Sequence, residues 1–218
     1  GERGFWLFFG ADRSIGDRIQ LKYALRLLSL PVTTVPSPIS IPLICHPASP
    51  CTAITGIETS VAPTADGGLA LHYRVRCTPG ALRLPSPSPA GPADGLWQHT
   101  CCEAFIGGGD APDYHEFNFS PSGQWAAYRF TDYRERDDRF LPSGEPRISL
   151  QPLADGFQLK ARLEAPLIPA APVLHLGLTV VIEAADGSKS YWALAHGSER
   201  PDFHLRQSFT LTLNRNTP

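Results

Sequence analysis

The chain has 218 residues, a length that fits one β-rich domain as well as two smaller domains. Its 22 prolines are roughly twice the ordinary share and exclude most long helices, and its formal net charge of −2 gives no reason to expect nucleic acid or an anionic membrane as a partner. Apolar residues make up 42% of the chain, enough for a sizeable core. Methionine is absent, so we expect a fragment, a processed product or a sequence read without its start codon.

Residues 1–40 differ in texture from the rest and predict an extension outside the main domain. Residues 1–30 contain no proline, and Ile19–Leu30 has the apolar spacing of a short amphipathic helix, with Asp17 as its cap. Residues 31–50 are rich in proline, serine and β-branched residues, which indicates an extended linker or an edge segment. No stretch reaches the roughly 20 apolar residues of a membrane-spanning helix, and no export signal is visible, which favours a cytoplasmic location.

The five cysteines are an odd number without CxxC or metal-finger spacing, so we do not expect a full disulfide framework. They are Cys45, Cys51, Cys77, Cys101 and Cys102. A bridge between Cys45 and Cys51 would close a short loop in an oxidising compartment, whereas free buried cysteine is the commoner state. Their redox state stays open at this point.

Strand patterns dominate from about residue 41 onward. Leu69–Cys77 and Phe157–Leu163 alternate apolar and polar side chains with period two. Val173–Ile182 is an apolar run typical of a buried central strand, and Leu205–Leu213 supplies a last strand. We therefore predict an all-β fold, an antiparallel β-sandwich of immunoglobulin or jelly-roll type with about eight to eleven strands. It would span residues 41–213, followed by a tail of residues 214–218.

Turn and loop signals separate the predicted strands. The turn dipeptides are Asp66-Gly67, Asp94-Gly95, Ser122-Gly123, Asp155-Gly156 and Asp186-Gly187, as hairpin connections require. The proline-dense segment Ala81–Gly95 is a loop, either a lid beside a site or a variable surface connection. The mixed-charge run Tyr133–Glu145 is interpreted as a solvated loop.

The most informative stretch is a predicted hairpin in which the turn Ser120–Gly123 joins two aromatic-rich strands. If Phe119 pairs with Gln124, alternation sorts the side chains onto two faces. One face then carries Tyr114, Glu116, Asn118, Trp125 and Arg129. The other face, assigned to the core, carries His115, Phe117, Phe119, Tyr128 and Phe130.

The first of these faces has the chemistry that a sugar needs. The apolar C–H faces of a pyranose stack on aromatic rings, and its hydroxyls bond planar donors and acceptors such as carboxylate, amide and guanidinium groups. The alternative is structural: Glu116 and Arg129 would form an ordinary ion pair, with Trp125 packed across it.

Five motifs stand out in this part of the chain: Leu96–Cys101, Glu103–Phe105, Tyr114–Tyr128, Ser190–His196 and Pro201–His204. Together they resemble bacterial DOMON-like domain proteins, which are relatives of the family 9 carbohydrate-binding modules (CBM9-like). The resemblance covers about residues 41–213 and leaves the first forty residues unmatched. It implies a β-sandwich that, as in DOMON-related domains generally, binds a sugar or haem.

Sugar-binding members of this superfamily hold a saccharide between tryptophans, so the resemblance makes Trp97, Trp192 and Trp125 candidates; for each one, the alternative is a tryptophan buried in the core. Cytochrome DOMON domains ligate haem through methionine and histidine, and this chain departs from that pattern because it has no methionine. Bis-histidine ligation stays formally open among His46, His72, His99, His115, His175, His196 and His204.

Catalytic and metal sites have less support. Glu103 and Glu116 lie on neighbouring predicted strands, and a carboxylate pair would permit glycoside hydrolysis at the right separation. No G-x-S-x-G elbow is present, and Gly107–Gly109 precedes no helix that could hold phosphate. A metal site from His99, Glu103 and His115 follows no spacing rule, and a structural calcium held by acidic loop residues is an equal alternative.

We therefore predict a non-catalytic domain that binds a carbohydrate or a similar small polar ligand, without a cofactor. The leading alternative is an accessory or structural interaction domain without a small-molecule site, followed by a haem-binding domain and a glycoside hydrolase. The predicted ligand-binding residues are Trp97, Tyr114, Glu116, Asn118, Trp125, Arg129 and Trp192. The sequence identifies neither a protein partner nor the sugar.

Overall fold

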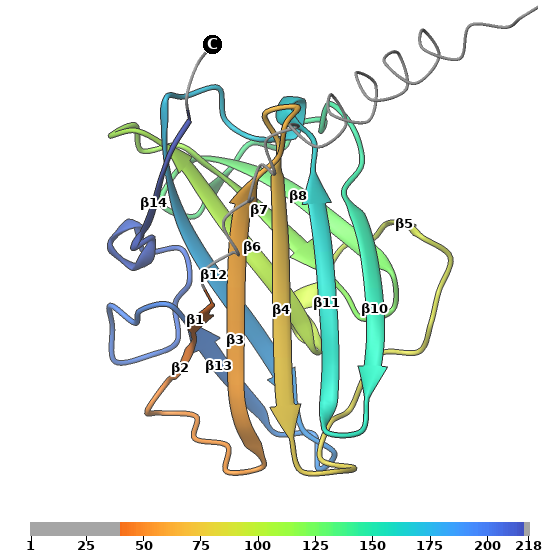
Figure 1. Ribbon diagram of the computed structural model, residues 1–218. Coiled ribbons are helices and arrows are strands. Elements are labelled where there is room, and N and C mark those ends of the chain that lie inside the picture. Colours follow the sequence, from red (N-terminus) through yellow and green to blue (C-terminus); the bar gives the residue numbers. More distant parts are fainter. Residues whose placement is uncertain (1–39, 216–218) are drawn as a thin grey trace, which may run out of the picture. The chain divides into compact units, whose positions relative to one another are not determined.

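Two β-sheets face one another in residues 40–215, the part of the chain that this computed structural model describes (Figure 1). The predicted helix at Ile19–Leu30, the linker up to residue 39 and residues 216–218 lie outside the described residues. Within residues 40–215, ten strands contain four residues or more and four strands contain two. The predicted all-β antiparallel sandwich is confirmed.

The first sheet has five strands, all paired antiparallel. Its order is β1 (Ile41–Pro42), β3 (Ile54–Pro63), β4 (Leu69–Cys77), β11 (Gly156–Leu163) and β10 (Arg147–Leu153). In β4 the positions of Leu71, Tyr73 and Val75 are buried, whereas the intervening positions are partly or fully exposed. The apolar residues of the period-two pattern are thus the ones that face the other sheet.

The second sheet has nine strands. Its main path runs β2 (Ile44–Cys45), β13 (Lys189–Ala193), β12 (Val173–Glu183), β6 (Cys101–Gly108), β7 (Tyr114–Phe119), β8 (Gln124–Asp132) and β5 (Gly91–Pro92), with β14 (Leu211–Asn214) on β12 and β9 (Glu135–Arg136) on β8. The β5–β8 pairing is parallel and two residues long. As predicted from its apolar run, β12 is central, because β6 pairs with one of its edges and β13 and β14 share the other.

Two local predictions are wrong. The predicted last strand Leu205–Leu213 is shorter, because Arg206–Ser208 forms a 3₁₀ turn (η3) and β14 begins at Leu211. Asp94-Gly95 is not a hairpin turn: Gly95, with φ of 72°, begins the 3₁₀ turn η1 (Leu96–Gln98). A third 3₁₀ turn, η2, spans Ala165–Leu167.

The nine-stranded sheet is buried on both faces. Its side chains toward the first sheet, such as Phe117, Leu176 and Leu178, belong to the main core. A second apolar cluster lies on its outer face and contains Phe105, Tyr114, Ala126, Tyr128, Phe130, Val181, Ala193, Phe203 and Phe209. Because successive side chains of a strand point to opposite faces, burial of both faces leaves β12 without an exposed position.

The β7–β8 hairpin departs from the predicted register by one residue. Phe119 pairs with Trp125, not with Gln124, and Glu116 pairs with Tyr128. The turn explains the shift: the Ser120 N–H bonds the Gln124 carbonyl (2.9 Å), so the loop has three residues and ends on Gly123 at φ of 96°. A one-residue shift moves every side chain of the second strand to the other face.

The corrected register reverses all four assignments made on β8. Tyr128 and Phe130, predicted for the core side, share the outer face with Glu116. Trp125 and Arg129, predicted beside Glu116, point to the opposite face with Phe119 and His115.

The second cluster is covered by the segment Leu194–Thr210, which joins β13 to β14 and is called the cover segment below. Phe203 and Phe209 insert from it into the cluster, where their ring centroids lie 6.4 and 5.7 Å from that of Phe105. The cover segment thereby closes part of a face that would otherwise expose apolar side chains to water.

Arg206 fastens the cover segment to the end of β6. Its Nη2 donates to the carbonyl oxygens of Gly109 (3.0 Å) and Ala111 (3.1 Å). The guanidinium lies directly over Gly107, where an added Cβ would sit 1.7 Å from Nη1. Glycine is required at this position because the arginine approaches the backbone so closely.

Gly107→Ala should push the Arg206 guanidinium away and cost about 1–3 kcal/mol of unfolding free energy, the usual effect of a lost charged hydrogen bond. Urea unfolding would measure it. In an Arg206→Ala background the same glycine substitution should cost little, because the clash is already gone. Equal costs in the two backgrounds would contradict the assignment.

Candidate functional site

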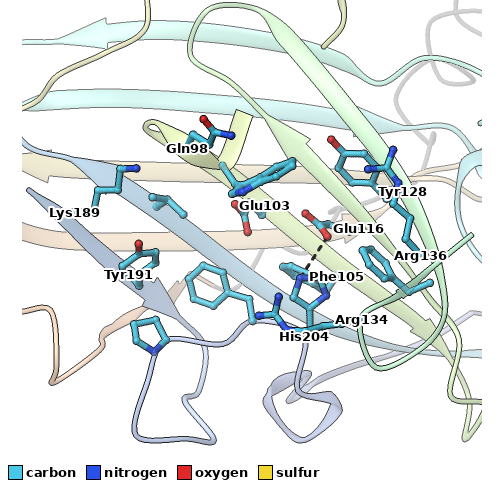
Figure 2. A pocket seen from close by; sticks show the side chains of 15 residues that line it. Gln98, Glu103, Phe105, Glu116, Tyr128, Arg134, Arg136, Lys189, Tyr191 and His204 are labelled. Atoms are coloured by element: carbon cyan, nitrogen blue, oxygen red, sulfur yellow. Dashed lines mark ion pairs between the residues drawn. The ribbon is translucent and has the colours of Figure 1, made fainter. Parts of the chain in front are cut away.

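A cavity of about 470 Å³ opens on the outer face of the nine-stranded sheet (Figure 2). Side chains of β6, β7, β8, β12 and β13 line it, together with η1, the turn before β9, β9 itself and the cover segment. A volume of this size lies within the ordinary range of small-ligand pockets. We call it the outer-face pocket.

Two glutamates form the floor of the outer-face pocket. Glu103 on β6 and Glu116 on β7 are 2% and 6% exposed. Because Asn118 lies opposite Glu103 and Phe105 opposite Glu116, the two carboxyl groups are diagonal neighbours on one face of adjacent strands. Burial of two carboxyl groups side by side is costly unless they are neutral or well bonded.

The two floor carboxyl groups are bonded unequally. Asn118 Nδ2 donates to Glu116 Oε1 at 2.7 Å. Thr179 Oγ1 donates to Glu103 Oε2 at 3.2 Å. Glu103 Oε1 is buried and has no hydrogen-bond partner among the described residues. That oxygen is therefore the polar atom of the floor that a ligand can satisfy.

Burial also changes the protonation of the floor. It raises the pKa of Glu116 to about 7, against an ordinary value of 4.5. It raises the pKa of Glu103 well above its ordinary value, and the neighbouring Glu116 carboxyl raises it further. Burial therefore favours the protonated form of both floor carboxyl groups, and Glu116 is partly protonated near neutral pH.

A chain of hydrogen bonds closes one side of the pocket. The Arg134 backbone N–H donates to Tyr114 Oη at 3.2 Å, and Tyr114 Oη is hydrogen-bonded to His204 Nδ1 at 2.8 Å. His204 Nε2 lies 3.8 Å from Glu116 Oε2. Burial lowers the pKa of His204 to about 4, and Arg134 lowers it further, so the imidazole is neutral. This chain joins the cover segment to the floor.

An aromatic wall stands beside the floor. Trp97 on η1 is 41% exposed, and its ring meets Tyr128 edge-on at a centroid distance of 6.0 Å. Tyr128 is buried, its hydroxyl donates to Asp94, and the Arg136 guanidinium lies 4.2 Å from its ring centroid. Trp97 thus offers an open indole surface, whereas Tyr128 supports it from below.

The predicted site residues divide into three groups. Trp97 and Glu116 line the outer-face pocket. Tyr114 and Asn118 are 0% exposed on the same face and position His204 and Glu116 through hydrogen bonds. Trp125, Arg129 and Trp192 do not line the pocket.

The three residues that were wrongly predicted to bind the ligand have structural roles. Trp125 and Trp192 are 6% and 8% exposed, and the Trp192 indole donates to Ser190 Oγ at 3.0 Å. Arg129 lies near Asp113 (3.4 Å) and Asp137 (3.9 Å), so the alternative of a Glu116–Arg129 ion pair is wrong as well. The register shift accounts for Trp125 and Arg129. Trp192 follows from its place on the inner face of β13.

Sequence reasoning missed most of the pocket's polar rim. Arg134 and Arg136 belong to the charged run interpreted as a solvated loop, Lys189 was not singled out, and His204 was considered only as a haem ligand and as part of the motif Pro201–His204. Glu103 was considered as half of a catalytic pair, as a metal ligand and within the motif Glu103–Phe105, but not as a ligand-binding residue. A signal did exist in β6, where Glu103 alternates with Phe105 inside an otherwise apolar strand.

The metal candidates from the sequence are not brought together. Glu103 and His115 point to opposite faces, and His99 Nδ1 bonds Glu183 at 2.7 Å. No cluster of three or more metal-binding side chains occurs within residues 40–215.

The five cysteines, all within this range, are free. In the same part of the chain no helix is long and apolar enough to cross a membrane.

Comparison with known proteins identifies a shared fold. No family model and no curated protein matches the chain. A solved structure from Bacteroides uniformis, provisionally described as a carbohydrate-binding protein, matches with a TM-score of 0.60 at 16% identity over 81% of this chain and 86% of that one. At this identity the likeness shows the fold.

Two structures of a family 9 carbohydrate-binding module from Caldicellulosiruptor kristjanssonii also match, one with cellotriose and one with glucose. Their TM-scores are 0.45 and 0.48 at 11% and 13% identity. The matches cover 72% and 76% of this chain and 72% and 78% of theirs. The resemblance to bacterial DOMON-like proteins stays a prediction.

Glu116→Gln should stabilise the protein at high pH. Since the native pKa is raised, the native state keeps a proton that the unfolded chain releases, so the wild type loses stability as pH rises from about 4.5 through about 7. We expect the variant to exceed the wild type by about 2 kcal/mol at pH 8 and by little at pH 4, in urea unfolding.

Glu58→Gln is the matched control for this measurement. Arg76 lowers the pKa of the exposed Glu58, so its removal should not stabilise the protein at pH 8. A Glu116→Gln difference that is the same at both pH values would contradict the raised pKa.

Proposed function

We propose that the outer-face pocket binds a saccharide and does not transform it. The observation that carries this proposal is the pairing of an open indole with a polar floor: Trp97 is 41% exposed at the rim, above the buried carboxyl groups of Glu103 and Glu116. An indole stacks on the C–H face of a pyranose, and carboxyl groups bond its hydroxyls.

The unpartnered oxygen of Glu103 supports a hydroxyl-bearing ligand. A protonated carboxyl offers a donor and an acceptor, and a sugar hydroxyl can meet either one. Gln98 adds an amide at the rim of the same pocket. The Bacteroides uniformis protein that shares the fold is provisionally described as carbohydrate-binding, which is consistent with this proposal.

Protonation of the floor argues against hydrolysis. A retaining glycosidase needs one carboxylate that stays ionised as the nucleophile and a second carboxyl group as the acid. Here Glu103 has a pKa far above its ordinary value and Glu116 titrates at about 7. Neither group supplies a permanently ionised carboxylate, so we assign both to binding.

The proposal includes no cofactor. Six of the seven histidines bond protein groups through a ring nitrogen: His46, His99, His115, His175, His196 and His204. An accessory interaction domain without a small-molecule site is the remaining alternative. The pocket, with its unpartnered buried oxygen, favours a ligand over that alternative.

Trp97→Ala should weaken saccharide binding by about tenfold or more, because it removes the stacking surface. Isothermal titration against a panel of mono- and oligosaccharides would measure the dissociation constant, and tryptophan fluorescence would report contact with the indole. The effect on folding should be small because Trp97 is 41% exposed and belongs to neither apolar core cluster.

Leu141→Ala is a suitable control, since this exposed apolar side chain lies outside the pocket. It should leave the dissociation constant unchanged. If Trp97→Ala bound every ligand of the panel as tightly as the wild type, or if the wild type bound none of them, the proposed function would be wrong.

A further inference from the structure

Three cationic side chains reach the rim of the outer-face pocket from different strands and turns. Arg134 and Arg136 come from the turn after β8 and from β9, and Lys189 comes from β13. In Figure 2 the carboxyl groups of Glu103 and Glu116 lie between Lys189 on one side and Arg136 on the other. A pocket built only for neutral hydroxyls has no need of positive charge at both ends.

Arg134 is the one whose charge is well neutralised. Its Nη2 lies 2.9 Å from Asp202 Oδ1, and Asp202 is mostly buried. The backbone of Arg134 has φ of 57°, an uncommon conformation for a residue other than glycine, and the ion pair helps to hold it. Arg134 therefore shapes the wall more than it attracts a ligand.

Arg136 is paired more weakly than Arg134 and is therefore more available to a ligand. Its nearest carboxylate oxygens are long contacts, 4.0 Å to Asp94 and 3.7 Å to Asp138, and Asp138 is 90% exposed. The guanidinium carbon of Arg136 lies over the Tyr128 ring, 4.2 Å from its centroid, and both side chains line the pocket. Exposed ion pairs at such distances contribute little, so a better acceptor can replace them.

Lys189 has no carboxylate oxygen within 4.0 Å in the part of the chain that the structure describes. Its cross-strand neighbour is Glu183, but that carboxylate is already occupied: Oε1 lies 3.1 Å from Arg83, and Oε2 lies 2.7 Å from His99 Nδ1. Lys189 thus lines the pocket with a positive charge that forms no ion pair with any described residue.

From Lys189, which has no ion pair within residues 40–215, and Arg136, whose ion pairs are long, with the buried carboxyl floor between them, we propose that the pocket takes an acidic saccharide, a sugar whose carboxylate pairs with Lys189 or Arg136. The inference rests on the proposed function and narrows its ligand class. The sugar ring would stack on Trp97, and its hydroxyls would meet the floor, where Glu103 Oε1 is unpartnered.

The floor allows an anion only while it is protonated. Burial favours the neutral form of Glu103, whereas Glu116 titrates at about 7. The groups around Glu116 are Glu103 on β6, Tyr114 on its own strand, Tyr128 on β8, Arg134, Arg136, His204 and Asp94. Of these, His204 is neutral above its pKa of about 4, so Glu116 is the group that changes charge near neutral pH.

The test compares matched sugars that differ only at carbon 6. Isothermal titration of the whole chain with methyl β-D-glucuronide and methyl β-D-glucoside, and with the corresponding galactose pair, gives four dissociation constants at pH 6 and again at pH 8. We expect one uronide to bind about five- to tenfold more tightly than its neutral partner at pH 6. The ratio should shrink severalfold at pH 8, as Glu116 becomes ionised.

Two variants separate the charge from the rest of the pocket. Lys189→Gln should remove much of the uronide preference and change the affinity for the neutral glycoside less than twofold. Lys160→Gln is the matched control, because Lys160 is an exposed lysine on β11 of the other sheet, and it should change nothing. In Glu116→Gln the preference should persist at pH 8.

The outcomes distinguish the acidic-sugar inference from the proposed function, saccharide binding. Binding of the neutral glycosides as tightly as the uronides would overturn the acidic-sugar inference and leave saccharide binding standing. A uronide preference unaffected by Lys189→Gln and Arg136→Gln would also overturn it. Binding of none of the four sugars would overturn both proposals.

Discussion

The arrangement depends on one constraint: the nine-stranded sheet must bury both of its faces. Its inner face packs against the five-stranded sheet, as in any sandwich, but its outer face carries aromatic rings and two glutamates that alternate with the inner apolar residues. Exposure of so many aromatic rings to water would be unfavourable, and the cover segment lies over part of them. The outer-face pocket is the part of this second interface that the cover segment does not fill.

Burial of the floor carboxyl groups links the fold to the chemistry of the pocket. Glu103 and Glu116 lie on the covered face, and removal from water raises the pKa of each; the neighbouring Glu116 carboxyl raises that of Glu103 further. The same burial keeps His204 neutral beside Tyr114, to which its Nδ1 is hydrogen-bonded. A solvated version of this site would hold two carboxylates and attract cations. The buried version can coexist with three cationic side chains at its rim.

Rigid and adjustable parts of the site come from different structural sources. The floor is built on β6 and β7, in the middle of the nine-stranded sheet, where neighbouring strands fix the backbone on both sides. Much of the rim comes from irregular segments, namely η1, the turn before β9 and the cover segment, with Arg136 of β9 and Lys189 at the start of β13 completing it. His204 of the cover segment is hydrogen-bonded to Tyr114 of β7. Binding residues on short irregular segments over a rigid sheet are common, because such segments can vary without disturbing the core.

Local pattern determined much of this protein from the sequence alone: period-two alternation predicted β4 and β11, the apolar run predicted central β12, and together they predicted the sandwich. Alternation in the hairpin also singled out Glu116, and the family resemblance singled out Trp97; both residues line the pocket. Tertiary structure decided the rest. The three-residue turn ending on Gly123 set the β7–β8 register and moved Trp125 and Arg129 away from Glu116, while Arg134, Lys189 and His204 reached the pocket from segments far apart in the chain. Alternation shows that a strand has two faces, but turn geometry and long-range packing select which residues share one, and neither is written in any single stretch of sequence.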